Sequence, residues 1–284
     1  MSNISRLTTL ASAGGKKLYT KSTLQLVTTA GSGTLSVPTD AVGMRVAVLG
    51  GGGAGSGFGT VSLSSRACGG GGAGCAATQI VAAEAIAYTV GAGGGFNSGS
   101  GGANSTASFG DYSLVGTGGL VGDTSVANST VLGSTGTGGD FNFSGGNSYG
   151  TATSKYPVST GGAGAGPNGN GADGTQIGST GSTYTSLGTK GSFVNDGNGW
   201  GPGGGAVGRL RTTSQSTLSV GNCSGLGLDL VNYGLVPETR GGHITQDIDP
   251  GSYYNGVLGG GGAAGGQNSG TPYGYGGGDG ALLV

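Results

Sequence analysis

A chain of 284 residues with 74 glycines, only 8% charged residues and a formal net charge of −1 does not have the composition of an ordinary globular domain. Its 11 Lys and Arg residues are scattered and form no basic run, which excludes nucleic acid as a partner. The three cysteines, Cys68, Cys75 and Cys223, are too few for a disulfide framework. Cys68 and Cys75 bracket a glycine run, and two buried thiols are the favoured interpretation over a disulfide between them.

The first 20 residues are interpreted as an N-terminal attachment segment. They lack the basic start and long apolar stretch of a secretion signal, and no segment of the chain has the ~20 apolar residues that a bilayer requires. We therefore expect assembly in the cytoplasm and no membrane insertion. Ile4, Leu7, Leu10 and Ala11 follow a helical spacing, so residues 1–13 are expected either as a short amphipathic helix that docks onto another chain or as a frayed terminus.

Conventional β-strand patterns occur in two places, mainly 21–49 and 76–90, and predict a small β base. Apolar residues alternate up to Val48, with a turn predicted at Pro38-Thr39-Asp40. The second stretch, AATQIVAAEAIAYTV, is compatible with strand or short helix. Residues 21–284 are assigned to a single glycine-rich domain.

The rest of the domain, 50–284, is organised around glycine runs, of which VAVLGGGGAGSGFG at 46–59 is the first. Glycine loses more backbone entropy on folding than other residues, so such runs need a compensating arrangement. In left-handed polyglycine II helices, bare backbones approach closely enough for N–H and C=O groups to pair between helices. The fold class expected is mostly irregular and all-β, with a small β-strand base plus a sandwich of packed polyglycine II helices linked by variable loops. The further runs lie at 69–74, 91–95, 161–174, 197–205, 259–266 and 274–280.

No motif for catalysis or cofactor binding has the sequence context that it requires. Gly50, Gly52 and Gly55 satisfy G-x-G-x-x-G after an apolar strand, but no room follows for a crossover helix and no acidic residue lies ~20 positions on. His243 is the single histidine, Asp247 and Asp249 match no calcium loop, and no two carboxylates are paired for glycoside hydrolysis. We therefore expect no enzyme activity, no cofactor and no metal.

The order of strand, Pro-containing turn, RVAVLGGGGAG, GGGGAG, YTVGAGG, GGANSTASFG and terminal GGGDGALLV resembles the glycine-rich domain of bacteriophage tail fibres. The resemblance covers about residues 31–119 and the last few, and the middle resembles that family only in composition. It is similar in particular to the polyglycine-II tip adhesin of T-even-like phages, whose glycine-rich motifs form a helix sandwich with receptor-contacting loops. The resemblance implies a place in the virion (tail fibre), host attachment, and contact with other tail proteins through the N-terminal segment.

Long inserts separate the later runs. They are longer than a chain reversal requires, and they are rich in aromatic residues. They span 120–132, 140–160, 175–196, 206–220 and 228–258. Tyr and Trp combine a rigid apolar face with a polar group, which suits recognition of an outer-membrane protein or glycan, although several can equally cover the flanks of a lattice. The residues predicted to bind the receptor are Tyr149, Tyr156, Tyr184, Trp200, Tyr233, Tyr253 and Tyr254. A structural virion spacer or decoration protein and a surface-glycan hydrolase are the alternative functions.

Overall fold

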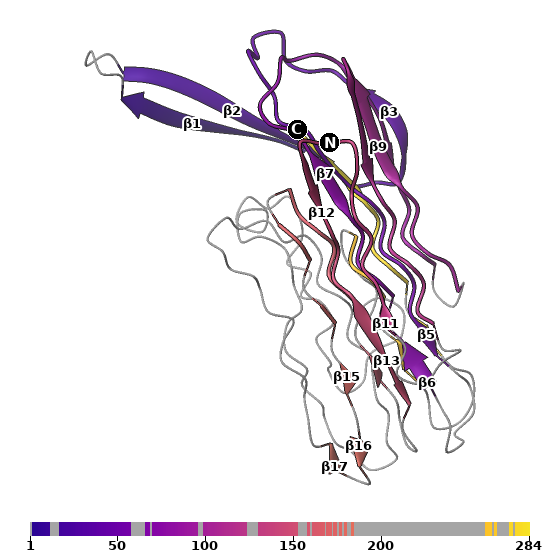
Figure 1. The fold of residues 1–284 in the computed structure, drawn as a ribbon. Coiled ribbons are helices and arrows are strands. Elements are labelled where there is room, and N and C mark those ends of the chain that lie inside the picture. The colour runs from indigo at the N-terminus through magenta and orange to yellow at the C-terminus, as the bar shows by residue number, and fades with distance from the viewer. Residues whose placement is uncertain are drawn as a thin grey trace.

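The computed structural model shows an all-β protein, with no helix in the residues that it describes. It describes residues 2–11, 17–57, 66–68, 70–95, 99–123, 130–152, 158–159, 161–167, 169–171, 173–174, 176–177, 179–180, 183–184, 259–262, 264–265, 273–274 and 276–284. Every pair of neighbouring strands is antiparallel, and strands from distant parts of the chain lie side by side (Figure 1).

Two sheets form the base of the molecule. The first has the order β1 (Ser2–Ala11), β2 (Lys17–Val27), β20 (Ala281–Leu283), β4 (Ala47–Leu49), β7 (Cys75–Ala77) and β12 (Phe141–Phe143). The second has the order β10 (Tyr112–Gly116), β9 (Ser105–Phe109), β8 (Ile86–Val90) and β3 (Gly31–Leu35).

Three smaller groups of strands lie at the other end of the molecule (Figure 1). One sheet has the order β11 (Thr130–Val131), β13 (Ser148–Ala152), β6 (Arg66–Cys68) and β5 (Ser56–Gly57). Another has the order β15 (Gln176–Ile177), β14 (Val158–Ser159), β18 (Ala264–Gly265) and β19 (Tyr273–Gly274). The strands β16 (Ser179–Thr180) and β17 (Thr183–Tyr184) form a hairpin.

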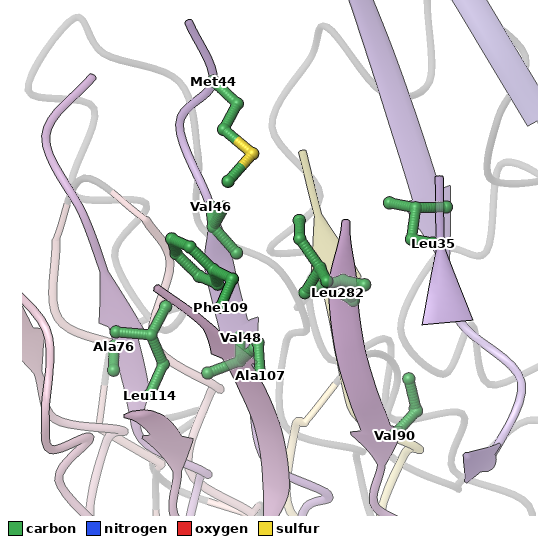
Figure 2. Packing of buried hydrophobic residues seen from close by; sticks show 11 residues of the cluster. Leu35, Met44, Val46, Val48, Ala76, Val90, Ala107, Phe109, Leu114 and Leu282 are labelled. Carbon is green, nitrogen blue, oxygen red and sulfur yellow. The ribbon is translucent and has the colours of Figure 1, made fainter. Parts of the chain in front are cut away.

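The hydrophobic core lies on both faces of the first sheet because successive strand residues face opposite sides. Val48 belongs to a cluster that packs against the second sheet, with Leu35, Ile86 and Leu114 (Figure 2). Ala47 and Leu49 belong to a second cluster on the opposite face, together with Ala73 and Ala165 of the glycine runs. Conventional apolar packing is therefore concentrated at the base.

Glycine-rich runs continue directly from these strands toward the far end (Figure 1). Run 50–54 follows β4, run 70–74 precedes β7, and run 276–280 precedes β20. The three strands are neighbours in the sheet, and their runs are joined by backbone hydrogen bonds as well. The order of the first sheet is thus carried on into a segment with almost no side chains.

Residues of a run donate their N–H groups to three different neighbours in turn. In run 50–54 the donor and acceptor pairs are Gly50 N–Gly74 O (3.1 Å), Gly51 N–Ala103 O (2.9 Å), Gly52 N–Gly278 O (2.8 Å), Gly53 N–Gly71 O (3.1 Å) and Ala54 N–Ser100 O (3.0 Å). In run 70–74 they are Gly70 N–Gly262 O (2.8 Å), Gly71 N–Leu120 O (2.8 Å), Gly72 N–Gly146 O (3.0 Å), Ala73 N–Gly259 O (2.9 Å) and Gly74 N–Thr117 O (2.9 Å). Residues three apart therefore donate to the same neighbouring run.

The carbonyl groups of run 50–54 accept from three additional runs. Gly52 O accepts from Gly94 N, Gly53 O accepts from Gly262 N, and both Gly51 O and Ala54 O accept from run 117–122. Run 50–54 therefore donates hydrogen bonds to three runs and accepts hydrogen bonds from three others, so it is bonded to six runs in all. Each net hydrogen bond contributes about 0.5–1.5 kcal/mol, so the main chain supplies the cohesion that side chains supply at the base.

Asn and Asp side chains replace main-chain acceptors in several runs. The pairs are Gly118 N–Asn104 Oδ1 (2.9 Å), Gly133 N–Asn147 Oδ1 (2.9 Å), Gly93 N–Asp279 Oδ1 (2.9 Å), Ser144 N–Asn170 Oδ1 (2.9 Å) and Asn147 N–Asp173 Oδ1 (2.7 Å). A short side-chain carbonyl thereby satisfies a donor that would otherwise lack a partner inside the protein.

Strands occur within 21–49 and 76–90, where β-strand patterns were recognised, and 76–90 contains no helix. The two base sheets also include β1, β9, β10, β12 and β20, which lie outside those ranges. The helix expected over 1–13 is wrong, because Ser2–Ala11 is a strand whose ten residues pair with β2. The insert 140–160 is not one loop, since it contains β12 and β13. The predicted turn is confirmed by a hydrogen bond from Ala41 N to Pro38 O (3.0 Å), and Cys68 and Cys75 are free and buried as predicted.

Candidate functional site

The strands that flank the connections between runs gather at the end opposite the base (Figure 1). β5 and β6 pair with each other on either side of 58–65, and β18 and β19 pair on either side of 266–272. β13 and β14, which flank 153–157, belong to the same two small sheets, and β16 pairs with β17 across 181–182. Four connections from distant parts of the sequence therefore start and end on one terminal surface, called here the distal end.

The base end has a different character, with apolar side chains exposed on its described loops. Val42 is 96% exposed and Ile80 is 80% exposed. The two loops are neighbours, because Met44 pairs with Val81 and a Cβ built at Gly43 would lie 2.9 Å from Ile80 Cγ2. The hairpin of β1 and β2 also extends from this end, beyond the point where β2 pairs with β20 (Figure 1).

Tyr149 is the one predicted receptor residue whose side chain the structure describes. It lies on β13, is half-buried, and donates a hydrogen bond from its hydroxyl to Asp173 Oδ2 (2.8 Å). This hydrogen bond, together with burial and the Asp173 charge, raises the pKa of Tyr149 above its usual value. Asp173 also accepts from Asn147 N, so Tyr149 is tied into the flank of the glycine runs.

The other predicted receptor residues are placed less fully. Tyr184 lies on β17, which the structure describes by its backbone pairing with β16 at the distal end. Tyr156, Trp200, Tyr233, Tyr253 and Tyr254 lie outside the described residues. His243, Asp247 and Asp249 lie outside them as well.

Arg45 connects the base to the turn after run 161–166. Its Nε donates to Thr78 O (3.2 Å), its Nη2 donates to Pro167 O (2.8 Å), and its guanidinium lies 5.8 Å from the centre of the Phe141 ring. Sequence reasoning missed this role, since a lone Arg before an apolar strand carries no local signal for a partner 122 residues away.

The described residues contain no group of three or more His, Cys, Asp or Glu side chains placed to hold a metal ion. A search of the same residues for a helix long and apolar enough to span a bilayer finds none. Burial raises the pKa of the Cys75 thiol to about 12, with Arg45 opposing the shift, so this thiol is protonated at neutral pH and is a poor nucleophile.

Comparison with known proteins adds no relative. No protein-family model matches the chain, and no curated protein matches it.

Proposed function

We propose that this protein is a bacteriophage tail-fibre tip adhesin that recognises a host-cell surface receptor with the loops at its distal end. One observation carries the proposal: connections far apart in the sequence are flanked by strands that meet on a single terminal surface. Loops held together on a rigid scaffold are the usual way to combine variable recognition with a constant fold. The order of glycine runs in the sequence resembles such adhesins.

The rigid scaffold of this proposal is a lattice of polyglycine II helices. A polyproline II-type helix has three residues per turn and no internal hydrogen bonds, so each N–H is free to donate to a neighbouring helix. The spacing of three between donors to the same run, and the six bonded neighbours of run 50–54, are what such a lattice requires. The absence of Cβ atoms lets the backbones come this close.

The base end attaches the adhesin to the virion in this proposal. It carries the exposed Val42 and Ile80 and the hairpin of the N-terminal attachment segment, on the side facing away from the distal loops. Other virion tail proteins are the partners here, and an outer-membrane protein or glycan of the host is the partner at the distal end. The proposed role includes no catalytic activity.

Loop exchange tests the receptor surface. The segments 153–157 and 228–258 are each replaced by a Gly/Ser linker of equal length, and adsorption of recombinant phage to host cells is measured. We expect at least a tenfold slower adsorption for one of them, because a few aromatic residues usually dominate a binding interface. The exchange stops at 153–157, because replacing all of 140–160 would remove β12 and β13.

Tyr112→Phe is the control at the base, outside the distal end. It removes a hydroxyl that donates to Asp140 while leaving the ring in place, so it is expected to leave adsorption unchanged. Melting curves confirm folding for each variant. Unchanged adsorption by every folded loop exchange would favour a virion spacer, and steady release of oligosaccharide from host glycans by the purified chain would favour a hydrolase.

A further inference from the structure

The outer edge of β1 is a long strand edge that has no partner strand within the described residues. β1 forms one side of the first sheet and pairs over its ten residues with β2 alone. The opposite edge of this sheet, β12, is only three residues long. A ten-residue edge exposes backbone N–H and C=O groups that template pairing with another strand.

β1 also lacks the features that usually block edge pairing. Its sequence, SNISRLTTLA, has one charged residue, Arg6, and contains neither proline nor glycine. The hairpin extends beyond the base, and two-stranded hairpins are at best marginally stable in water. A further strand beside β1 would supply both the missing hydrogen bonds and additional stabilisation.

The register of the hairpin places four apolar residues, Ile4, Leu10, Leu18 and Leu24, at positions that share one face. Ile4 pairs with Leu24, Leu10 pairs with Leu18, and Ser2 pairs with Leu26, so all of these positions share a face. Leu26 is buried in the core cluster that contains Leu49 and Leu283. The apolar face of the hairpin is therefore the outward continuation of a core face of the sheet.

We propose that β1 pairs antiparallel with β1 of a second copy of this chain, with Leu7 opposite Leu7 across a twofold axis. This register places Ile4 opposite Leu10 of the second copy, and Leu10 opposite its Ile4. Together with the pairing inside each hairpin, it produces two cross-strand rows of four apolar residues, each running Leu24, Ile4, Leu10, Leu18 across both copies. Such cross-strand pairs are the unit of sheet stabilisation.

The neighbouring registers are less favourable. A shift by two residues in one direction places Arg6 opposite Arg6, which puts like charges across the pair, and in the other direction it places the charged Arg6 opposite Leu10. A shift by one residue joins the apolar face of one hairpin to the polar face of the other. The self-complementary register also meets the requirement of a twofold interface, in which the same surface serves both copies. This inference goes beyond receptor recognition and does not depend on it, and it leaves the loops of Val42 and Ile80 at the base for contact with other tail proteins.

A charge-swap cycle between Ile4 and Leu10 tests the pairing. These two residues lie six positions apart on one strand, roughly 20 Å at ~3.4 Å per residue, so they contact only through a second copy. In sedimentation equilibrium we expect a species of twice the 26.7 kDa chain mass. We expect Ile4→Glu and Leu10→Lys each to raise the dissociation constant at least tenfold, and the double variant to recover most of that loss.

Disulfide trapping provides an independent measurement that does not require a weakened hairpin. In a Cys223→Ser background, Leu7→Cys is expected to yield a covalent dimer on oxidation. Ser5→Cys is the matched control, because its own counterpart would lie four positions away, roughly 13 Å at ~3.4 Å per residue, beyond the ~7 Å Cα limit of a disulfide. Three results would each overturn the proposal: a monomer at all concentrations, additive effects of the two charged changes, or equal cross-linking of the two cysteine variants. The edge of β1 would then be free to pair with a strand of a different protein.

Discussion

Ala54, Ala73 and Ala165 are fully buried inside glycine runs, so these three positions have room for a methyl group. Other positions in the same runs do not. A Cβ built at Gly261 would overlap the carbonyl oxygen of Gly70, and one built at Gly71 would lie 2.7 Å from the carbonyl oxygen of Leu132. At Gly261 and Gly71 the obstacle is the backbone of a neighbouring segment, and a backbone cannot rotate away as a side chain can.

Gly261→Val and Gly71→Val are therefore expected to destabilise the protein strongly, with Gly261→Val the worse of the two. Overpacking of a closed site usually costs about 1–3 kcal/mol, and a backbone obstacle favours the upper end. Ala73→Gly is the matched control in the same lattice and should cost about 1 kcal/mol. Thermal unfolding measures all three. Equal, small losses would show that the runs are flexible linkers.

Cys75 gives a pH dependence of stability with a defined sign. Its pKa is about 12 in the native protein, because burial disfavours the thiolate, against an ordinary value of 9.0 in the unfolded chain. Below pH 9 the thiol is protonated in both states and its contribution is complete. Between pH 9 and 12 only the unfolded state loses the proton, so the free energy of unfolding falls as the pH rises.

Chemical denaturation at pH 8 and pH 10 checks this expectation. The loss attributable to one such thiol is about 1.4 kcal/mol per pH unit above 9. Cys75→Ala should show a shallower loss than the parent over this interval, while Cys68→Ala serves as a second buried-thiol comparison. Identical slopes for parent and Cys75→Ala would contradict the assigned pKa shift.

At the scale of elements, the glycine runs differ from loops in the acceptors of their backbone N–H groups. The N–H groups of runs 50–54 and 70–74 donate to carbonyl groups of other runs, although these residues belong to no strand. We expect hydrogen exchange of Gly51, Gly52 and Gly72 to be as slow as that of Val48 in β4. The exposed loop residues Thr39, Asp40 and Val42 should exchange within the dead time and serve as the internal reference. Rapid exchange throughout the runs would mean that the hydrogen-bond network does not persist in solution.

Sequence alone predicted the elements whose signal is local and missed those whose signal is distant. The alternation before Val48 and the turn after Pro38 identified β4 and its approach correctly. β20 lies between β2 and β4, and no local pattern in Ala281–Leu283 indicates that the chain returns to the centre of the first sheet. Ile4, Leu7 and Leu10 fit a helical spacing, but Ile4 and Leu10 also fit a period of two, and pairing with β2 decides between them.

The candidate site was predictable in part for the same reason. The excess length of the inserts is a local property and was recognised, but which inserts share an end depends on the direction of every run. The structure places at the distal end the strands that flank 58–65 and 266–272, and neither segment had been selected from the sequence. Tyr149 was selected for its aromatic ring, whereas its partner Asp173 lies 24 residues away and gave no signal.

At the scale of the whole molecule, the hydrogen bonds between glycine runs have a calorimetric consequence. The heat capacity of unfolding arises from newly exposed apolar surface and is reduced by newly exposed polar surface. Glycine runs held by main-chain hydrogen bonds expose mostly peptide groups when they separate. We therefore expect a heat-capacity increment per residue clearly below the ordinary ~12–15 cal/mol/K, measured by scanning calorimetry over a series of pH values. A value in the ordinary range would mean that apolar burial, and not the main chain, holds the molecule together.

A small heat-capacity increment flattens the curve of stability against temperature. The free energy of unfolding of this protein should then change little between refrigeration and moderate warmth, because neither cold nor moderate heat alters the hydration of much apolar surface. In the proposed role at a virion tip, the distal loops would then keep the same arrangement over a wide range of temperature. Such tolerance of temperature would follow from glycine runs that are held together by main-chain hydrogen bonds.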